Sequence, residues 1–314
     1  MQWPLQRVLS KASSHLMLYL DEEQVRQHLR MEELIPAMEK ALIDFSAGKV
    51  TQPVRSVITV DPPGGFFGMM PALAEGLGIK LVTFYPPNAE LGIPTHMATI
   101  FLADPETGAP LAVMDGTLIT EMRTAAVSAA ATKLLAAPDA KVLTILGSGV
   151  QARSHNEALR LVRKFEEVRV WSPTKAHAEG FAEEIGAEAM SAEAAVRDAD
   201  VVVTATNSKM SILRGAWLKP GCHVNAVGAC RPDWRELDDE AMANVVFVDS
   251  REAAMKESGD VLLSGAKIYA ELGDTLAGKV PPRANETTIF KSLGMAVEDI
   301  AAALLVYRSA TATL

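Results

Sequence analysis

Apolar and polar positions follow two different patterns along the chain, and each predicts a different kind of structure. Residues 21–49 predict helices, because Asp21 precedes two acidic residues and 31–46 carries apolar residues at helical spacing before Gly48. Between 54 and 114, turn sequences separate short β-rich runs, which indicates an antiparallel meander. The expected strands of this meander are 57–60, 79–85, 99–102 and 111–114.

An Ala-rich helix over 124–137, stopped by Pro138, leads into a second pattern in which apolar strands alternate with helical stretches. The expected strands are 141–146, 167–171, 201–205, 223–226 and 245–248, and the expected helices are 150–164, 175–185 and 192–198. Continuous apolar strands joined by helices predict a parallel sheet covered on both faces. An amphipathic helix over 297–307 follows this unit and is expected to return to the first domain.

We therefore expect an α/β fold with two domains. Residues 123–294 should form a doubly wound parallel sheet of the Rossmann type. Residues 1–122 and 295–314 should form a discontinuous α+β domain. A length of 314 residues agrees with two domains.

Composition and charge exclude several classes of protein. The chain is 49% hydrophobic and 22% charged, as globular proteins are, and its formal net charge of −9 does not favour nucleic acid or an anionic membrane as a partner. It has no apolar run of the roughly 18–20 residues that cross a bilayer, and the apolar patch at 15–20 is too short for a secretory signal. Two cysteines and six scattered histidines provide neither a disulfide scaffold nor metal-ligand spacing. We expect a cytoplasmic protein without a metal.

The sharpest local motif lies at 147–152, where Gly-Ser-Gly-Val-Gln-Ala follows an apolar strand and opens a helix. Gly147 would allow the tight turn, Gly149 would let the backbone approach a pyrophosphate, and Ala152 is small enough for close helix–strand packing. In this context the motif predicts a dinucleotide-binding loop.

The end of the second strand of such a sheet distinguishes NADH from NADPH. An acidic residue there would bind a ribose 2′-hydroxyl, but this strand ends in Ser172, Pro173, Thr174 and Lys175. Two hydroxyls and a lysine favour a 2′-phosphate, so we expect NADPH. NADH stays possible, because Pro173 lacks a backbone donor and there is no arginine in this stretch.

Three cations stand in apolar or β-rich surroundings: Arg55, Lys80 and Arg123. An unpaired ammonium is costly to bury, and a cleft that holds an anionic ligand would offset this cost. Arginines could then clamp a carboxylate bidentately. Strand-edge charges or structural ion pairs are the alternative, and His96 taken alone is most simply a core histidine. The loops at 226–237 and 290–294 follow strands, where ligands of doubly wound sheets bind, and the first is expected to face the nicotinamide.

Together these residues resemble the ornithine cyclodeaminase/mu-crystallin family, and most closely its mu-crystallin branch, from about residue 18 to residue 307. The matching motifs are QPVRS (52–56), KLVTFY (80–85), AVMDG (112–116), RTAAVSA (123–129), ILGSGVQA (145–152), NAVG (225–228), RPDWRELDD (231–239), KESGDVLLSG (256–265) and FKSLGMAVED (290–299).

The resemblance implies a homodimer with a substrate and dimerisation domain around a Rossmann domain. It assigns substrate-carboxylate and catalytic roles to Arg55, Lys80 and Arg123, and it places Leu293 where substrate and nicotinamide meet. The expected cofactor-binding residues are Thr95, His96, Arg123, Thr124, Gly147, Ser148, Gly149, Val150, Gln151, Ser172, Thr174, Thr206, Val227 and Ser292. The substrate-binding set also includes Cys230, and guesses for the apolar walls are Phe67, Met69, Met70 and Leu293.

Two departures from the family pattern refine the expected activity. Cys230 stands where ornithine cyclodeaminases and archaeal-type alanine dehydrogenases have a catalytic aspartate, so deaminating cyclisation lacks its base. Pro173 stands where mammalian mu-crystallins have an arginine, which weakens the case for strict NADP preference.

We expect NAD(P)H-dependent reduction of the C=N bond of cyclic ketimines next to a carboxylate, giving cyclic amino acids. Lys80, with a pKa lowered by burial and by the arginines, is the expected proton donor or electrostatic organiser. In the alternative, solvent protonates the imine before it binds, and Lys80 only positions the carboxylate. An amino-acid dehydrogenase or reductive aminase, an ornithine cyclodeaminase-like enzyme and a non-catalytic ligand-binding protein stay open as alternatives.

Overall fold

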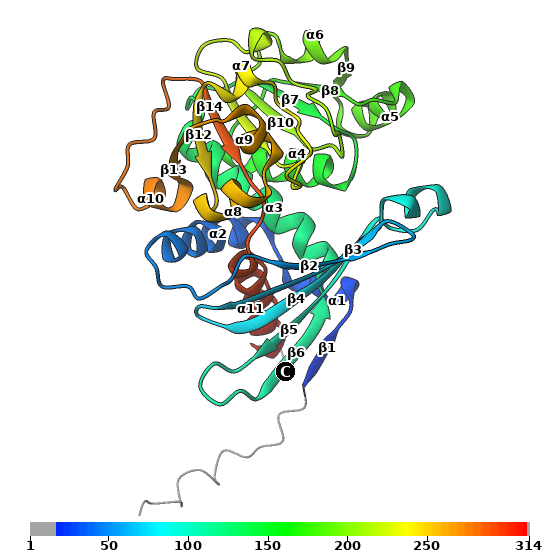
Figure 1. The fold of residues 1–314 in the computed structure, drawn as a ribbon, viewed down its shortest axis with the longest axis vertical. Coiled ribbons are helices and arrows are strands. Elements are labelled where there is room, and N and C mark those ends of the chain that lie inside the picture. The colour runs from blue at the N-terminus through cyan, green and yellow to red at the C-terminus, as the bar shows by residue number, and fades with distance from the viewer. Residues whose placement is uncertain (1–16, 313–314) are drawn as a thin grey trace, which may run out of the picture.

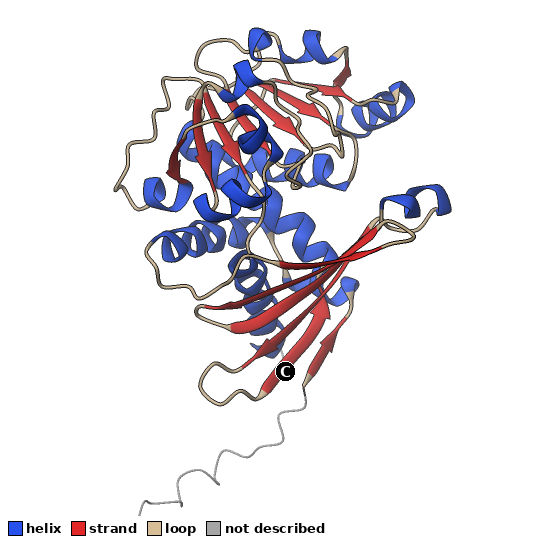
Figure 2. Cartoon of the chain, viewed as in Figure 1, coloured by secondary structure: helices blue, strands red, loops and turns tan. Residues whose placement is uncertain are grey.

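The computed structural model describes residues 17–312, so expectations for the first 16 residues and for residues 313–314 lie outside the described part. The described chain is built on two sheets, and the long helix α3 (Thr117–Leu135) lies between them (Figure 1). Helices cover the upper sheet on both faces and pack on one face of the lower sheet (Figure 2).

The lower sheet has the strand order β1-β6-β5-β4-β3-β2 among the described residues. Its strands are β1 (Leu18–Leu20), β2 (Ser56–Val60), β3 (Gly65–Leu73), β4 (Leu77–Phe84), β5 (His96–Ala103) and β6 (Pro110–Asp115). All neighbours are antiparallel except the edge pair β1 and β6, which is parallel. In this register Lys80 lies opposite Met70 and Ile100, so these three side chains share one face.

The upper sheet is parallel throughout, with the order β13-β12-β14-β11-β10-β7-β8-β9 in the described chain. Its strands are β7 (Val142–Leu146), β8 (Glu167–Trp171), β9 (Glu188–Ala189), β10 (Val201–Thr204), β11 (His223–Ala226), β12 (Val245–Val248), β13 (Ile268–Glu271) and β14 (Thr288–Lys291). The order reverses direction between β7 and β10, which is the point where doubly wound sheets bind their ligands.

Helices complete both layers. They are α1 (Glu22–His28), α2 (Met31–Ser46), α4 (Val150–Val162), α5 (Lys175–Ile185), α6 (Ala192–Val196), α7 (Asp239–Met242), α8 (Arg251–Glu257), α9 (Gly259–Ser264), α10 (Leu272–Leu276) and α11 (Ala296–Ala312), with short 3-10 turns η2 (Pro86–Leu91) and η3 (Gly215–Trp217). Asp21 and Gln24 form a reciprocal capping box at the start of α1. Among the described residues, no helix is long and apolar enough to cross a membrane.

The chain passes between the two layers through α3 and again after β14, where it descends into α11 (Figure 1). Helix α11 packs against α2, α3 and strands β3 to β5, so most of its surface is buried. On the other side, α10 packs on α2 so closely that a Cβ at Gly273 would lie 2.0 Å from the Leu42 carbonyl oxygen. The two layers therefore share one continuous apolar core.

The structure confirms the expected α/β class, the parallel sheet and the antiparallel meander. Several elements differ from the expectations, however. Strands β1, β3, β9 and β13 were not expected, and residues 290 and 291, expected in a loop that follows a strand, belong to strand β14 itself. Helix α3 starts at Thr117, so the expected boundary between residues 122 and 123 falls inside a helix.

Candidate active site

The turn between β7 and α4 has the backbone shape of a phosphate-binding loop. Gly147 has φ +140°, and a Cβ there would lie 2.5 Å from the Ala205 carbonyl oxygen, so a side chain would clash. At Gly149 a Cβ would meet none of the described atoms within 4 Å, which leaves open space beside the start of α4. No side chain of the described chain caps α4, so its first N–H groups are available to an anion. These residues fit the pyrophosphate of a dinucleotide.

The end of β8 lies next to this loop. The Ser148 and Ser172 hydroxyls form a 2.9 Å hydrogen bond, so the residue after β8 is in direct contact with the glycine loop. The buried Gln151 Oε1 has no hydrogen-bond partner among residues 17–312, as expected of a side chain that faces a ligand. Arg153, which was not predicted, donates from Nη1 to the Ser148 carbonyl at 2.7 Å. The position of Arg153 in the first helical turn after the glycine loop could have identified it as a residue that contacts this loop.

The segments after β10 and β11 continue this edge of the sheet. The Thr206 N–H and hydroxyl both donate to the Glu236 carboxylate at 2.7 Å. The Val227 N–H donates to the Thr204 carbonyl at 3.0 Å, and Cys230 beyond it is exposed. Thr206 and Val227 therefore lie on neighbouring strand ends, beside the glycine loop.

The loop after β11 also reaches the lower sheet. The Arg231 guanidinium lies 3.8 Å from the centre of the Phe66 ring, and Trp234 meets Phe84 edge to face at 6.5 Å between ring centres. Phe66 and Phe84 lie on the same face of the lower sheet as Lys80. The loop thus connects the two layers at the side of the molecule where the cations lie.

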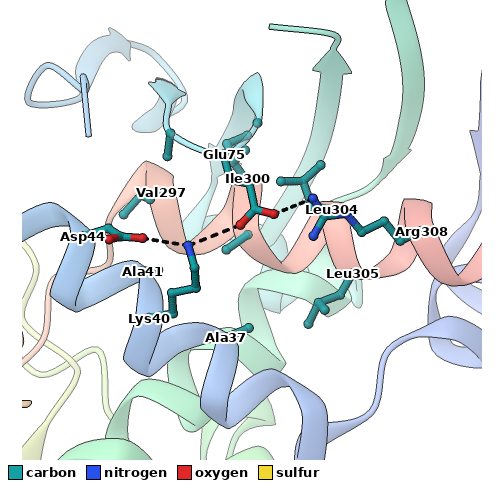
Figure 3. A pocket seen from close by; sticks show the side chains of 13 residues that line it. Ala37, Lys40, Ala41, Asp44, Glu75, Val297, Ile300, Leu304, Leu305 and Arg308 are labelled. Carbon is teal, nitrogen blue, oxygen red and sulfur yellow. Dashed lines mark hydrogen bonds and ion pairs between the residues drawn. The ribbon is translucent and has the colours of Figure 1, made fainter. Parts of the chain in front are cut away.

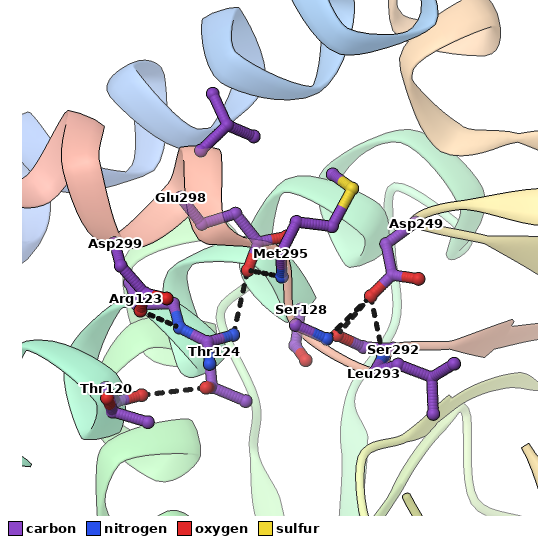
Figure 4. Close-up of polar contacts among 12 residues, drawn as sticks. Thr120, Arg123, Thr124, Ser128, Asp249, Ser292, Leu293, Met295, Glu298 and Asp299 are labelled. Atoms are coloured by element: carbon purple, nitrogen blue, oxygen red, sulfur yellow. Dashed lines mark hydrogen bonds and ion pairs between the residues drawn. The ribbon is translucent and has the colours of Figure 1, made fainter. Parts of the chain in front are cut away.

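Lys80 and Arg123 share a buried pair of carboxylates from α11 (Figure 4 shows the Arg123 side). Lys80 Nζ lies 2.7 Å from Asp299 Oδ2, and Arg123 Nε lies 3.0 Å from Asp299 Oδ1. Arg123 Nη1 pairs with Glu298 Oε2 at 2.8 Å. Both cations are almost fully buried and both carboxylates are completely buried. Glu298 and Asp299 were not expected in the site, although they lie in the first turn of the expected C-terminal helix.

Arg55 approaches the same point from the segment before β2. Its Nη2 donates to the carbonyls of Leu293 and Gly294 at 2.8 and 3.0 Å, and its Nε pairs with Glu257 Oε2 at 3.1 Å. Gly294 has φ +78°, and a Cβ there would lie 2.5 Å from Arg123 Nη1. The segment at 293–294 therefore lies between the two arginines, which leaves Arg55 Nη1 and Arg123 Nη2 as donors for a further anion.

Burial and neighbouring charges shift the pKa values of this cluster. Burial lowers the pKa of Lys80 to about 8, against the opposing effect of Asp299, and the two arginines lower it further. Burial raises the pKa of Glu298 to about 7, although Arg123 opposes the change. Burial and the nearby cations lower the pKa of His96 to about 4, so this imidazole is neutral at physiological pH. Lys80 is thus a cation that is poised to release its proton near neutrality.

Asp249, at the end of β12, orders the segment that joins β14 to α11. Its Oδ2 accepts hydrogen bonds from the N–H groups of Leu293 at 2.6 Å and Gly294 at 2.8 Å, and from the Ser292 hydroxyl at 3.3 Å (Figure 4). Asp249 is fully buried. It was also missed, although its position directly after a parallel strand was a usable signal.

The other expected site residues divide between two groups. Thr124 lies beside Arg123 and donates its hydroxyl to the Thr120 carbonyl at 2.7 Å, while Thr95 and His96 precede and open β5. His96 and Thr124 lie near the cations, whereas Ser172 and Thr174 follow β8, next to the edge strand β9 of the parallel sheet. A dinucleotide has to span this distance.

Two of the guesses for apolar walls were wrong. In the register of β3 and β4, Met70 lies opposite Lys80, so Phe67 and Met69 point to the opposite face of the sheet. Met70 is buried on the face of Lys80.

A cavity of about 160 Å³ lies elsewhere, between α2, α11 and the turn that joins β3 to β4 (Figure 3). Its rim is neutralised by its own ion pairs, since Glu75 contacts both Lys40 at 3.3 Å and Arg308 at 2.6 Å. The residues expected in the active site do not line this cavity.

Comparisons with known proteins agree with this geometry. Residues 15–313 match the model of the ornithine cyclodeaminase/mu-crystallin family. Ketimine reductase mu-crystallin of Mus musculus is 53% identical over 302 residues, which cover 93% of this chain and 96% of that protein.

Two solved structures share the fold. Δ1-Pyrroline-2-carboxylate reductase of Thermococcus litoralis, in complex with NADH and L-proline, has a TM-score of 0.90 and 37% identity over 95% of this chain and 98% of its own. An archaeal alanine dehydrogenase dimer with bound NAD has a TM-score of 0.89 and 34% identity over 95% of this chain and 97% of its own. Motifs, fold and comparisons together show that the chain belongs to the ornithine cyclodeaminase/mu-crystallin family.

Proposed function

We propose that the protein is an NAD(P)H-dependent ketimine reductase, which reduces the C=N bond of cyclic imines that carry a carboxylate on the imine carbon. The observation that carries this proposal is the cluster of buried Lys80 and Arg123, joined through Asp299, with the half-buried Arg55 beside residues 293–294 after β14. The named activities of the Mus musculus and Thermococcus litoralis relatives support it.

In this proposal Arg55 and Arg123 bind the substrate carboxylate through their remaining N–H donors, on either side of Leu293. Both guanidinium groups are already held by acidic partners, Glu257 for Arg55 and Glu298 with Asp299 for Arg123. This arrangement fixes the imine carbon in one orientation before reaction, which reduces the entropy cost of the chemical step.

Reduction adds a hydride to the imine carbon and a proton to the nitrogen. The nicotinamide, when bound, supplies the hydride. Lys80 supplies the proton, because its pKa of about 8 makes it a stronger acid than an ordinary lysine while it is still charged at neutral pH. Asp299 holds Lys80 Nζ at 2.7 Å and so orients the donor. Lys80 then regains its proton from solvent.

The cofactor is proposed to be NADPH, with NADH as the alternative. Ser172, Thr174 and Lys175 at the end of β8 carry no acidic group for a ribose 2′-hydroxyl. The cofactor-binding set is proposed as the sequence predicts it, from the glycine loop through Thr206 and Val227 to Ser292.

We also propose a homodimer that forms through the outer face of the lower sheet. The division into two domains is proposed as the sequence predicts it. This face exposes large apolar side chains, which indicates an interface. Examples are Tyr19, Ile58, Leu81 and Met97. The archaeal relative is named as a dimer. The cytoplasmic location also stays a prediction, and the two unpaired cysteines, Cys222 and Cys230, agree with it.

Dependence on ammonia tests the proposed reaction against an amino-acid dehydrogenase or reductive aminase. We expect oxidation of NADPH with preformed Δ1-pyrroline-2-carboxylate in the absence of ammonia, and little oxidation with pyruvate at any ammonia concentration. Oxidation that needs pyruvate together with ammonia or an amine would contradict the proposal. Cys230, at the position of the missing aspartate, is the residue to vary in that case.

A further inference from the structure

The parallel sheet contains a second buried polar cluster, separate from the cations that the proposed mechanism uses. It consists of Glu236, Asp260 and Lys291, and all three side chains are fully buried. Buried charges are costly unless each one has partners, so the burial of these three side chains requires an explanation.

The Glu236 carboxylate joins the ends of two neighbouring strands. Its Oε2 accepts the Thr204 hydroxyl at 2.7 Å, at the end of β10, and the Gly228 N–H at 2.9 Å, after β11. Its Oε1 accepts both the N–H and the hydroxyl of Thr206 at 2.7 Å. One side chain therefore fixes both segments.

The position of Glu236 is itself fixed by the other two members of the cluster. Asp260 Oδ1 accepts the N–H of Glu236 at 2.7 Å and that of Leu237 at 3.0 Å. Lys291 Nζ pairs with Asp260 Oδ2 at 3.1 Å and donates to the Gly228 carbonyl. The hydrogen bonds and the Lys291–Asp260 ion pair thus close a ring from Glu236 through Asp260, Lys291 and Gly228 back to Glu236.

The segments that Glu236 holds border the glycine loop. The Ala205 carbonyl oxygen, between Thr204 and Thr206, is the atom that a Cβ at Gly147 would strike at 2.5 Å. The same close packing occurs at Gly228, where a Cβ would lie 2.5 Å from the Glu236 carboxyl carbon. A shift of the Glu236 carboxylate therefore moves the surface next to the phosphate-binding turn.

We propose that Glu236 is a positioning residue for cofactor binding, which acts through Thr206 and Gly228 to hold the ends of β10 and β11 against the glycine loop. The proposal rests on the proposed nicotinamide cofactor. A carboxylate suits the role because both of its oxygens accept N–H donors, one from Thr206 and one from Gly228. In Glu236→Gln an amide NH2 would replace one acceptor and face one of these donors.

The test measures NADPH affinity by fluorescence titration and thermal stability on the same samples. The variants are Glu236→Gln and the milder Thr204→Val, which removes one hydrogen bond to Glu236 Oε2. Two matched controls lie at a distance from the cofactor edge. Asp200→Asn removes a carboxylate that accepts the N–H groups of Lys141 and Val142 at the opposite end of the sheet. Thr144→Val removes a buried hydroxyl that donates to the Ala195 carbonyl.

We expect the Kd for NADPH to rise roughly tenfold or more in Glu236→Gln and several-fold in Thr204→Val, because binding must first order the two segments. The controls should lose comparable thermal stability and keep the wild-type Kd. An unchanged Kd in folded Glu236→Gln overturns the proposal. If that variant does not fold, an unchanged Kd in Thr204→Val overturns it, and so does an equal loss of affinity in the controls. Failure of the wild type to bind either nicotinamide would instead refute the proposed cofactor.

Discussion

Replacement of Lys80 by methionine tests the proposed proton donor most directly. The substitution keeps an unbranched chain of similar length and removes the charge. Lys80 is nearly fully buried, and its ammonium lies 2.7 Å from Asp299. Methionine can occupy this space, but it can neither donate a proton nor pair with a carboxylate.

We expect Lys80→Met to lower both kcat/KM and the free energy of unfolding. Loss of a general acid lowers the rate by roughly 100- to 10,000-fold, so kcat/KM for the imine should fall within that range. Removal of one partner from a buried ion pair destabilises a protein by about 3–5 kcal/mol. Arg123 still pairs with Asp299 Oδ1 in the variant, so we expect a loss near the lower value. NADPH affinity should stay close to that of the wild type, because Lys80 lies outside the glycine loop.

Lys291→Met is the matched comparison for this experiment. Lys291 is also fully buried and also pairs with a buried aspartate, Asp260, at 3.1 Å. Both variants should lose stability. Lys80→Met should lose turnover and keep the NADPH affinity of the wild type, whereas Lys291→Met should lose NADPH affinity. The assay combines steady-state kinetics with fluorescence titration of NADPH. A folded Lys80→Met protein with near-normal turnover, or with a parallel loss of NADPH affinity, would refute the role of Lys80.

Three further expectations concern pH, the glycine loop and the proposed interface. Because the pKa of Lys80 is lowered to about 8, its protonated form is lost as the pH rises through that value, so kcat/KM should decline above about pH 8. Lys80→Arg stays charged but does not release its proton, so it should be slow at every pH and its residual kcat/KM should lack this decline, whereas a decline that persists in Lys80→Arg would belong to titration of the substrate. Gly149→Ala puts a Cβ into the open space beside α4 and should weaken NADPH binding at unchanged stability, whereas Gly180→Ala, on the exposed face of α5, should raise stability by roughly 0.5–1 kcal/mol and leave binding unchanged. Leu81→Glu on the outer sheet face should convert the proposed dimer to monomers in light scattering, and the exposed Leu161→Glu on α4 should not; a dimeric Leu81→Glu protein would place the interface elsewhere.

Local patterns predicted those elements that have strong local signals. The glycine loop, helix α5 and strands β8, β11 and β12 all lie at the expected positions, because apolar runs and turn residues mark their ends. Strand β3 was missed since it contains two glycines and Pro71, which are unfavourable in strands. Its pairing with β2 and β4 on both sides stabilises it in spite of this composition.

Strand β14 shows a different limit of prediction. It has only four residues including Lys291, and residues 290 and 291 were expected in a loop, yet the strand occupies a central position between β11 and β12. Only the tertiary structure provides Asp260 and the Gly228 carbonyl as partners for this lysine. A single sequence does not reveal such long-range pairing.

The cations of the candidate site were predicted from the sequence, but its carboxylates were not. Arg55, Lys80 and Arg123 stood out because charge is unusual in an apolar run. Glu298, Asp299 and Asp249 were missed, because acidic residues at the start of a helix or after a strand are common on protein surfaces. The fold buries these carboxylates, which join Lys80 to Arg123 and order the segment at 293–294 beside Arg55.

In the proposed function, the protein reduces a preformed cyclic imine that carries a carboxylate. The most direct measurement is the loss of NADPH absorbance after addition of Δ1-piperideine-2-carboxylate, with the product identified as the corresponding cyclic amino acid and NADH run in parallel. We predict turnover without ammonia and a faster reaction with NADPH than with NADH. Tight NADPH binding without any turnover of the imine would contradict the proposed reduction and favour an amino-acid dehydrogenase or a ligand-binding protein.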